Sequence, residues 1–359
     1  MLLTRRRFVQ GTAGLAGAAF LTPLLAACSS DEGNKLAFLN WQDYIDPKVL
    51  EDFTQRTGAA VTYQTYASND ELQSLLVQAD RARRGGRKGK TYDLAVPSDN
   101  VIAGFLRDDL IQELDLDRIP NLDNLASQYL DRGYDPGNHF SVPWATGTTG
   151  IGFDTKVFDE PPDWTVFLDA KHKDRMTILD EKRDAFGLAL LSLGLDPNST
   201  SQEDIDKATE RLLEMKEQIL GFDSSTYLDK LANGDLDCAH AYSSDLLEAQ
   251  RTRPSLAFTL PPQGALRWVD NLVVPTDAPR KSTAEDFINF YLQPDVSAEV
   301  MSYVLVDTGN EKAYDLISQD LKDNQVVFPP PEVTANLQFL ADLGDDEARY
   351  TKAWEKVTG

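Results

Sequence analysis

The stretch LAFLNWQDY at residues 36–44 passes from a short apolar run to Trp41, Asp43 and Tyr44. Apolar runs of this length are typical of buried strands, and the Asp46-Pro47 pair that follows is typical of a helix start. In open α/β sheets, ligands bind outside the carboxyl ends of the strands. We therefore expect a binding cleft to begin at this strand end. An ordinary strand followed by turn residues is the alternative that the stretch alone leaves open.

The next segments continue the alternation of strands and helices. The pattern predicts a helix over 47–57, a strand over 61–66 and a helix from residue 69 to residue 77. The basic run RARRGGRKGK at Arg81–Lys90 is predicted to be a solvated loop, with contact to an anionic polymer as the weaker alternative. Residues 140–153 contain the glycine-rich GTTG, which predicts an irregular, hinge-like crossing between two lobes.

Residues 1–28 have the features of an export signal. They combine the twin-arginine sequence TRRRF with a run of small and apolar residues and the cleavage sequence LAAC. This pattern resembles a bacterial lipoprotein signal, which predicts that Cys28 becomes a lipidated N-terminus and that residues 29–35 form a polar tether. The protein would then lie outside the cytoplasm, at the outer face of the cytoplasmic membrane or in the periplasm. A retained transmembrane helix is the weaker interpretation, because a stable span needs about 20 apolar residues.

The charge of the chain is strongly negative, with 35 Lys and Arg against 58 Asp and Glu, a net charge of −23. Such a surface repels nucleic acid and attracts cations, so no nucleic-acid partner is expected. Solubility alone is the commoner reason for an acidic surface. Once Cys28 is lipidated, Cys238 has no disulfide partner, and its apolar neighbours predict a buried thiol.

Catalytic signatures are weak throughout. The three histidines, His139, His172 and His240, lack metal-ligand spacing, and neither a G-x-S-x-G elbow nor a phosphate loop is present. We therefore expect no catalytic residue, metal or cofactor. A hydrolase that uses a pair of carboxylates remains a weak alternative, because pairs arise by chance in a chain with 58 acids.

Aromatic and acidic residues recur together at the ends of predicted elements. A linear polyamine needs this combination, since its methylenes pack on flat apolar walls and its ammonium groups need carboxylates. Each residue alone also has an ordinary role, as a core aromatic, an acid in the first turn of a helix or a turn cap. The set is Trp41, Asp43, Tyr44, Glu181, Asp184, Tyr242, Asp245, Trp268 and Asp270.

Several long collinear segments resemble the spermidine/putrescine-binding proteins of bacterial ABC importers. They include LAFLNWQDYIDPKVLEDFTQRTG, YDLAVPS, GYDPGNHFSVPWATGTTGIGF, LDEKRDAFGLALLSLG, RWVDNLVVP and INFYLQPDV. The resemblance implies an α/β protein with the two-lobe periplasmic-binding-protein fold (type II), mixed sheets flanked by helices and a hinge between the lobes. The first lobe would comprise 36–145 and 270–307, and the second 146–269 and 308–359.

The resemblance also implies roles for individual residues. Glu181 and Asp184 would receive ammonium ends, while Trp268 and Asp270 would supply an aromatic wall and the carboxylate that recognises an amine. The ligand-binding residues implied in this way are Trp41, Asp43, Tyr44, Ser98, Glu181, Asp184, Tyr242, Trp268 and Asp270. The implied function is that of a membrane-tethered monomer that delivers a polyamine or a related organic cation to the membrane subunits of an ABC permease.

Four positions depart from the family pattern. Asn100 stands in place of an aromatic residue, Tyr242 in place of a tryptophan, Val306 in place of a tyrosine and Leu340 in place of a polar amide. A thinner aromatic box leaves open another diamine, an opine-like compound or a different cationic metabolite as the ligand. The other functions left open are a secreted hydrolase with a carboxylate pair in the cleft, and a sensor or interaction lipoprotein without a transport role.

Overall fold

The computed structural model describes residues 34–87, 89–276 and 278–359. The predicted signal at 1–28, with the lipidation site Cys28, lies outside the described residues. Residues Asn34–Gly359 form one compact unit. No helix within the described ranges is long and apolar enough to cross a membrane.

The described residues form a ten-stranded mixed sheet in the order β2-β1-β3-β9-β4-β7-β5-β6, with β10 paired to β9 and β8 paired to β4. Strands β1, β2 and β3 are parallel, whereas β4 and β9 are antiparallel to each other. The strands are β1 (Lys35–Trp41), β2 (Ala60–Tyr66), β3 (Leu94–Ala95), β4 (Ser141–Asp154), β5 (Met176–Ile178), β6 (Gly221–Phe222), β7 (Cys238–Tyr242), β8 (Leu256–Thr259), β9 (Ala265–Val273) and β10 (Leu337–Phe339).

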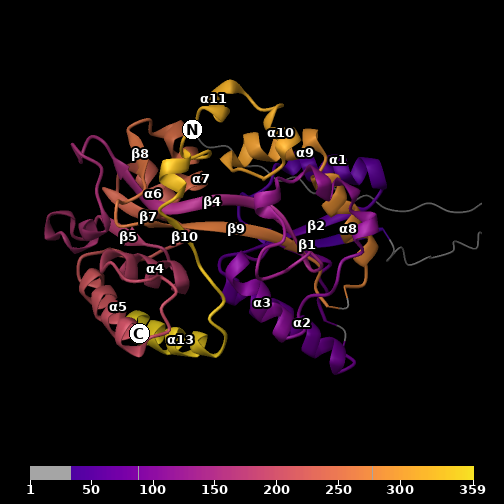
Figure 1. Ribbon diagram of the computed structural model, residues 1–359, viewed down its shortest axis with the longest axis horizontal. Coiled ribbons are helices and arrows are strands. Elements are labelled where there is room, and N and C mark those ends of the chain that lie inside the picture. Colours follow the sequence, from indigo (N-terminus) through magenta and orange to yellow (C-terminus); the bar gives the residue numbers. More distant parts are fainter. Residues whose placement is uncertain (1–33, 88, 277) are drawn as a thin grey trace, which may run out of the picture. The chain divides into compact units, whose positions relative to one another are not determined.

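Helices lie on both sides of the sheet (Figure 1). The α-helices are α1 (Pro47–Thr57), α2 (Asn69–Arg84), α3 (Asp99–Arg107), α4 (Lys182–Ser192), α5 (Gln202–Lys216), α6 (Tyr227–Asn233), α7 (Ser243–Thr252), α8 (Lys281–Tyr291), α9 (Pro294–Val300), α10 (Glu311–Tyr314), α11 (Gln319–Lys322), α12 (Pro331–Thr334) and α13 (Glu347–Thr358). A π-helical turn, η6 (Met301–Leu305), continues α9, and short 3-10 turns lie at Leu116–Arg118, Pro120–Asn124, Ser127–Tyr129, Trp164–Leu168, Ala170–His172 and Gly344–Asp346.

The opening strand and helix follow the sequence closely. The side chain of Asp46 caps the N-terminus of α1 by accepting a hydrogen bond from the Lys48 amide, and Pro47 occupies the first turn. Gly58 ends the helix in the left-handed conformation at φ 75°, which glycine adopts without steric cost. This helix therefore turns the chain back into β2, which pairs in parallel with β1 from Lys35 to Trp41.

The two long strands, β4 and β9, each pass through two hydrophobic cores. Val142 and Trp144 at the start of β4 pack in a core with β1 and α8, whereas Ile151 and Phe153 at its end pack with α4 and α5. Strand β9 runs the opposite way, so its Ala265 end lies in the second core and Leu272 lies in the first. Residues between the cores, among them Trp268 and Asp270, therefore lie where the two halves of the sheet meet.

The predicted irregular segment at 147–150 is wrong, because these residues lie in the middle of β4. The glycines serve close packing instead of flexibility. A Cβ atom on Gly147 would lie 2.3 Å from Cζ2 of Trp268, and one on Gly150 would lie 2.4 Å from the Thr259 carbonyl oxygen. Glycine is the residue that allows such close approaches within a strand.

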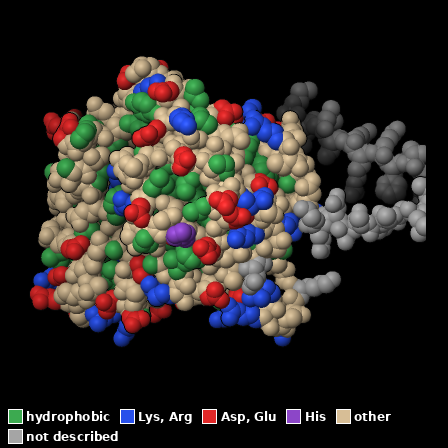
Figure 2. All heavy atoms as spheres, turned by 45° about the vertical axis from the view of Figure 1, so that its right-hand side comes forward, with side chains coloured by type: hydrophobic (Ala, Val, Ile, Leu, Met, Phe, Trp, Pro, Cys, Tyr) green, Lys and Arg blue, Asp and Glu red, His purple; other side chains and the backbone are tan. Residues whose placement is uncertain are grey.

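The basic run at Arg81–Lys90 is only partly a loop. Helix α2 continues to Arg84, seven residues beyond its predicted end at 77, and is capped by Ser68. Arginine is a good helix former, and both Arg83 and Arg84 form ion pairs with Asp80 one turn earlier. Acidic and basic side chains are intermingled on the face drawn in Figure 2.

Candidate functional site

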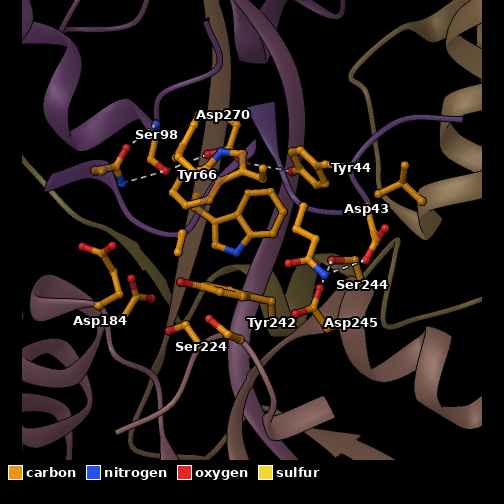
Figure 3. A pocket seen from close by; sticks show the side chains of 18 of the residues that line it. Asp43, Tyr44, Tyr66, Ser98, Asp184, Ser224, Tyr242, Ser244, Asp245 and Asp270 are labelled. Carbon is orange, nitrogen blue, oxygen red and sulfur yellow. Dashed lines mark hydrogen bonds between the residues drawn. The ribbon is translucent and has the colours of Figure 1, made fainter. Parts of the chain in front are cut away.

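A cavity of about 640 Å³ lies where the two halves of the sheet meet. Side chains from strand ends, helix starts, the middle of β9 and the turn η6 line it, and Figure 3 shows how some of them face one another. All the ligand-binding residues predicted from the sequence contribute to this one cavity: Trp41, Asp43, Tyr44, Ser98, Glu181, Asp184, Tyr242, Trp268 and Asp270.

Asp270 is the most firmly held of these acids. Its carboxylate accepts a hydrogen bond from Tyr44 Oη at 2.9 Å and another from Ser98 Oγ at 2.7 Å. Ser98 precedes α3 and also forms a β-bridge with Asp270, which fixes the register of the two segments. Burial raises the pKa of Asp270 to about 7, although the hydrogen bonds from Ser98 and Tyr44 act in the opposite direction.

Glu181 and Asp184 lie at the N-terminus of α4, where the helix dipole favours negative charge. Thr149 Oγ1 donates to Asp184 at 3.1 Å. Burial raises the pKa of Asp184 to about 6, opposed by the hydrogen bond from Thr149. Burial and then the charge of Asp184 raise the pKa of Glu181 to about 8. One Glu181 oxygen, Oε2, is buried without a hydrogen-bond partner in the part of the chain that the structure describes.

The two basic residues between Glu181 and Asp184, Lys182 and Arg183, do not line the cavity. Lys182 Nζ lies 3.0 Å from Glu347 Oε1, and Arg183 Nη1 lies 3.2 Å from Glu347 Oε2. Both basic side chains are almost completely buried, and Glu347 belongs to the C-terminal helix α13. Within the LDEKRD sequence, Glu181 and Asp184 therefore face the cavity, while the two basic residues between them anchor α13.

A third acidic group lies on the other side of the cavity. In Figure 3, Asp43 and Asp245 face the cavity from the side opposite Asp184. Tyr242 lies between Asp184 and Asp245. Asp43 adopts a left-handed backbone conformation at φ 53°, and its side chain is exposed. Tyr227 Oη donates to Asp245 at 2.5 Å, and burial raises the pKa of Asp245. Acids are therefore distributed around the cavity instead of forming one cluster.

Aromatic rings form the walls between these acids. Trp41 Nε1 donates to the Val96 carbonyl at 2.8 Å, and the Trp41 ring lies 4.6 Å from that of Tyr66. The Trp268 ring rests on Gly147, whose missing side chain makes room for it. Tyr242 is perpendicular to Trp268, with ring centroids 6.2 Å apart. The cavity therefore combines flat apolar surfaces with buried carboxylates.

Other residues of the cavity were missed or set aside. Tyr66 is the last residue of β2, and Asp99 and Tyr227 are the first residues of α3 and α6, so a search for polar and aromatic residues at the ends of elements could have found all three. Asp99 is buried, and its burial, followed by the charge of Asp270, raises its pKa well above the usual range. Asp245 also lines the cavity. The sequence places it among the aromatic and acidic residues at element ends, but the family resemblance does not imply a ligand-binding role for it.

The four departures from the family pattern fall in different places. Asn100, Tyr242 and Leu340 line the cavity. Val306 is buried in the hydrophobic core with β1 and α8 and does not line it. The aromatic wall therefore contains Tyr242 but receives no ring from positions 100, 306 or 340.

The histidines and the cysteine lie outside the cavity. His172 Nδ1 lies 2.9 Å from Asp237 Oδ2, and burial lowers the pKa of His240 to about 3. Cys238 is a buried free thiol, as predicted, and burial raises its pKa. Within the described ranges, no group of three or more His, Cys, Asp or Glu side chains could hold a metal ion.

Comparison with known proteins identifies the family. The model for bacterial extracellular solute-binding proteins matches residues 48–330. The chain is 32% identical to a putrescine-binding periplasmic protein of Escherichia coli, over 96% of both chains. It is 29% identical to a spermidine/putrescine-binding periplasmic protein of Salmonella typhimurium, over 96% of this chain and 97% of that protein.

A solved structure shows the same architecture. A Listeria monocytogenes protein, provisionally named a spermidine/putrescine ABC transporter, matches with a TM-score of 0.85 and 29% identity, covering 90% of this chain and 99% of that chain. This match confirms the predicted two-lobe fold of type II periplasmic binding proteins, with a mixed sheet flanked by helices. The chain therefore belongs to the family of bacterial extracellular solute-binding proteins.

Proposed function

We propose that this protein captures a polyamine such as spermidine or putrescine and delivers it to the membrane subunits of an ABC importer. The observation that carries the proposal is the combination of buried Asp270 and Glu181 and half-buried Asp184 with the rings of Trp41 and Trp268 in one cavity. The names of the relatives support the same class of ligand. No observation favours a hydrolase or a sensor.

The energetics require both kinds of residue. Burying one methylene contributes about 0.8 kcal/mol, so four contribute about 3 kcal/mol. Micromolar affinity requires about 8 kcal/mol, and the ammonium groups must supply the difference. A ring face contributes on the order of 0.5–2 kcal/mol per ammonium group, and an unpaired buried charge would cost several kcal/mol. A buried carboxylate such as Asp270 is therefore essential to the affinity.

Capture requires closure of the two lobes on the ligand. We assign 36–145 with 270–307 to the first lobe and 146–269 with 308–359 to the second, so that Asp270 and Glu181 approach the ligand from opposite lobes. Contacts across this division include Lys182 Nζ with Asp70 Oδ2 at 3.5 Å, and an ion pair of Arg107 with Asp342. A ligand that binds the closed form more tightly than the open form shifts the population toward closure.

Export and anchoring complete the proposed function. The twin-arginine signal and the LAAC sequence support lipidation at Cys28, with residues 29–35 as the tether. The relatives are periplasmic proteins, which supports a location outside the cytoplasm. The tethered monomer would bind its ligand there and present it to the permease.

Calorimetric titration of Asn34–Gly359 with spermidine and putrescine tests this function. We expect saturable binding that Asp270→Asn weakens by about tenfold or more, because the amide removes the buried charge that pairs with an ammonium group. Asp159→Asn is the matched control, since Asp159 is exposed and does not line the cavity. Absence of heat with every polyamine would contradict the ligand class, and full affinity in Asp270→Asn would contradict the role of Asp270.

A further inference from the structure

The π-helical turn η6 brings a short segment to the cavity. Met301 in this turn is fully buried and packs with Leu247 of α7, while Tyr303 and Val304 line the cavity. Leu305 ends the turn in the left-handed conformation at φ 63°, which is costly for a residue with a side chain. Wide turns and strained residues of this kind occur frequently at functional sites.

Tyr303 is the exposed aromatic residue of this turn. Its exposed fraction is 42%, and it is one of the few large apolar side chains exposed within the described ranges. The others are Val157, Leu220, Tyr314 and Leu316, and none of these lines the cavity. A ring that lines a cavity while remaining almost half exposed lies at its rim.

The position of the turn relates Tyr303 to one end of the cavity. Because Met301 packs on Leu247, η6 lies against α7, the helix whose first turn carries Asp245. Asp245 and Asp43 are opposite Asp184 (Figure 3). A ligand that extends from the acids of α4 toward Asp245 therefore approaches the rim at which Tyr303 lies.

We propose that Tyr303 is a ligand-contacting residue that selects for longer polyamines. This inference rests on the proposed function. A polyamine long enough to reach the Asp245 end packs its methylenes and ammonium group on the Tyr303 ring and covers its exposed face. A shorter diamine held at the acids of α4 and Asp270 leaves that ring in solvent.

Calorimetric titration of ring variants with spermidine and putrescine tests this role. We expect Tyr303→Ala to weaken spermidine binding on the order of tenfold. The same substitution should weaken putrescine binding by about threefold or less. Tyr303→Phe should bind spermidine as tightly as the unmodified protein, because the ring makes the contact. Tyr303→Lys should weaken spermidine binding more than Tyr303→Ala, because it places a cation beside a cation.

Tyr314→Ala is the matched control, since Tyr314 is 39% exposed and does not line the cavity. We expect it to bind both ligands like the unmodified protein. Unchanged spermidine affinity in Tyr303→Ala, or an equal loss for both ligands, would overturn the inference and leave the proposed function intact. Absence of polyamine binding to the unmodified protein would overturn both.

Discussion

The proposed contacts of the ligand with the carboxylates of the cavity predict that ligand affinity depends on pH. Burial raises the pKa values of Asp184, Asp270 and Glu181 to about 6, 7 and 8. Each acid is therefore protonated, and unable to pair with an ammonium group, at a pH where an exposed carboxylate is ionised. A primary amine with a pKa near that of lysine, about 10.4, stays charged throughout this range.

The affinity for a polyamine should therefore rise with pH. From pH 5.5 to pH 8, we expect the dissociation constant to fall by about tenfold or more, because binding to the ionised acids no longer requires them to lose a proton. Calorimetry at pH 7 in two buffers with different ionisation enthalpies should show proton release on binding. Affinity that falls with pH, or binding without proton release, would argue against these acids as the ligand contacts.

Strand β4 depends on its glycines for packing. The sequence suggested a flexible crossing at 147–150, because glycine is common in loops and its local signal does not distinguish flexibility from close contact. The deciding neighbours, Trp268 and Thr259, are more than a hundred residues away in the chain. Long-range contacts of this kind cannot be inferred from one segment.

Substitution of Gly150 should therefore destabilise the fold. We expect Gly150→Ala to lower the free energy of unfolding by about 1–3 kcal/mol, since the new Cβ meets a backbone oxygen that cannot move aside easily. Gly221→Ala is the matched control, because this glycine also lies in a strand but has nothing within 4 Å of the added Cβ. Chemical denaturation measures both changes, and equal stability of the two variants would show that β4 tolerates the larger residue.

Most elements were nevertheless predictable where local signals are strong. The α1 helix was bounded correctly at Pro47 and Thr57, because Asp46 and Gly58 supply its caps. The predicted end of α2 at residue 77 is wrong, because the glycines and positive charges of the run 81–90 suggest a loop, whereas the helix propensity of Arg81–Arg84 extends the helix. Caps thus determine helix ends better than composition does.

At the scale of the whole molecule, the cavity is formed by segments that are distant in the chain. Most predicted site residues lie at the end of a strand or the start of a helix, where ligands of α/β proteins collect, whereas Trp268 and Asp270 lie in the middle of β9. Their meeting in one cavity depends on the antiparallel pairing of β4 with β9. No local pattern in the sequence predicts that pairing. Neither the position of residues at element ends nor the family resemblance indicated Tyr303, because a π-helical turn has no sequence signal in a single chain.

The two-lobe arrangement explains why the acids of the cavity come from different parts of the sequence. Asp270 follows the aromatic wall on β9, while Glu181 and Asp184 begin α4, which the C-terminal helix α13 anchors through Glu347. In the proposed function, binding energy is divided between the two halves of the molecule, and a ligand that contacts both stabilises the closed form.

Native mass spectrometry of Asn34–Gly359, incubated with spermidine, putrescine and the diol analogue of putrescine, tests the central claim most directly. The proposed function predicts one bound polyamine per chain and no retained diol, because the buried carboxylates require a positively charged partner. Retention of the diol as well as putrescine, or absence of any bound polyamine, would contradict it.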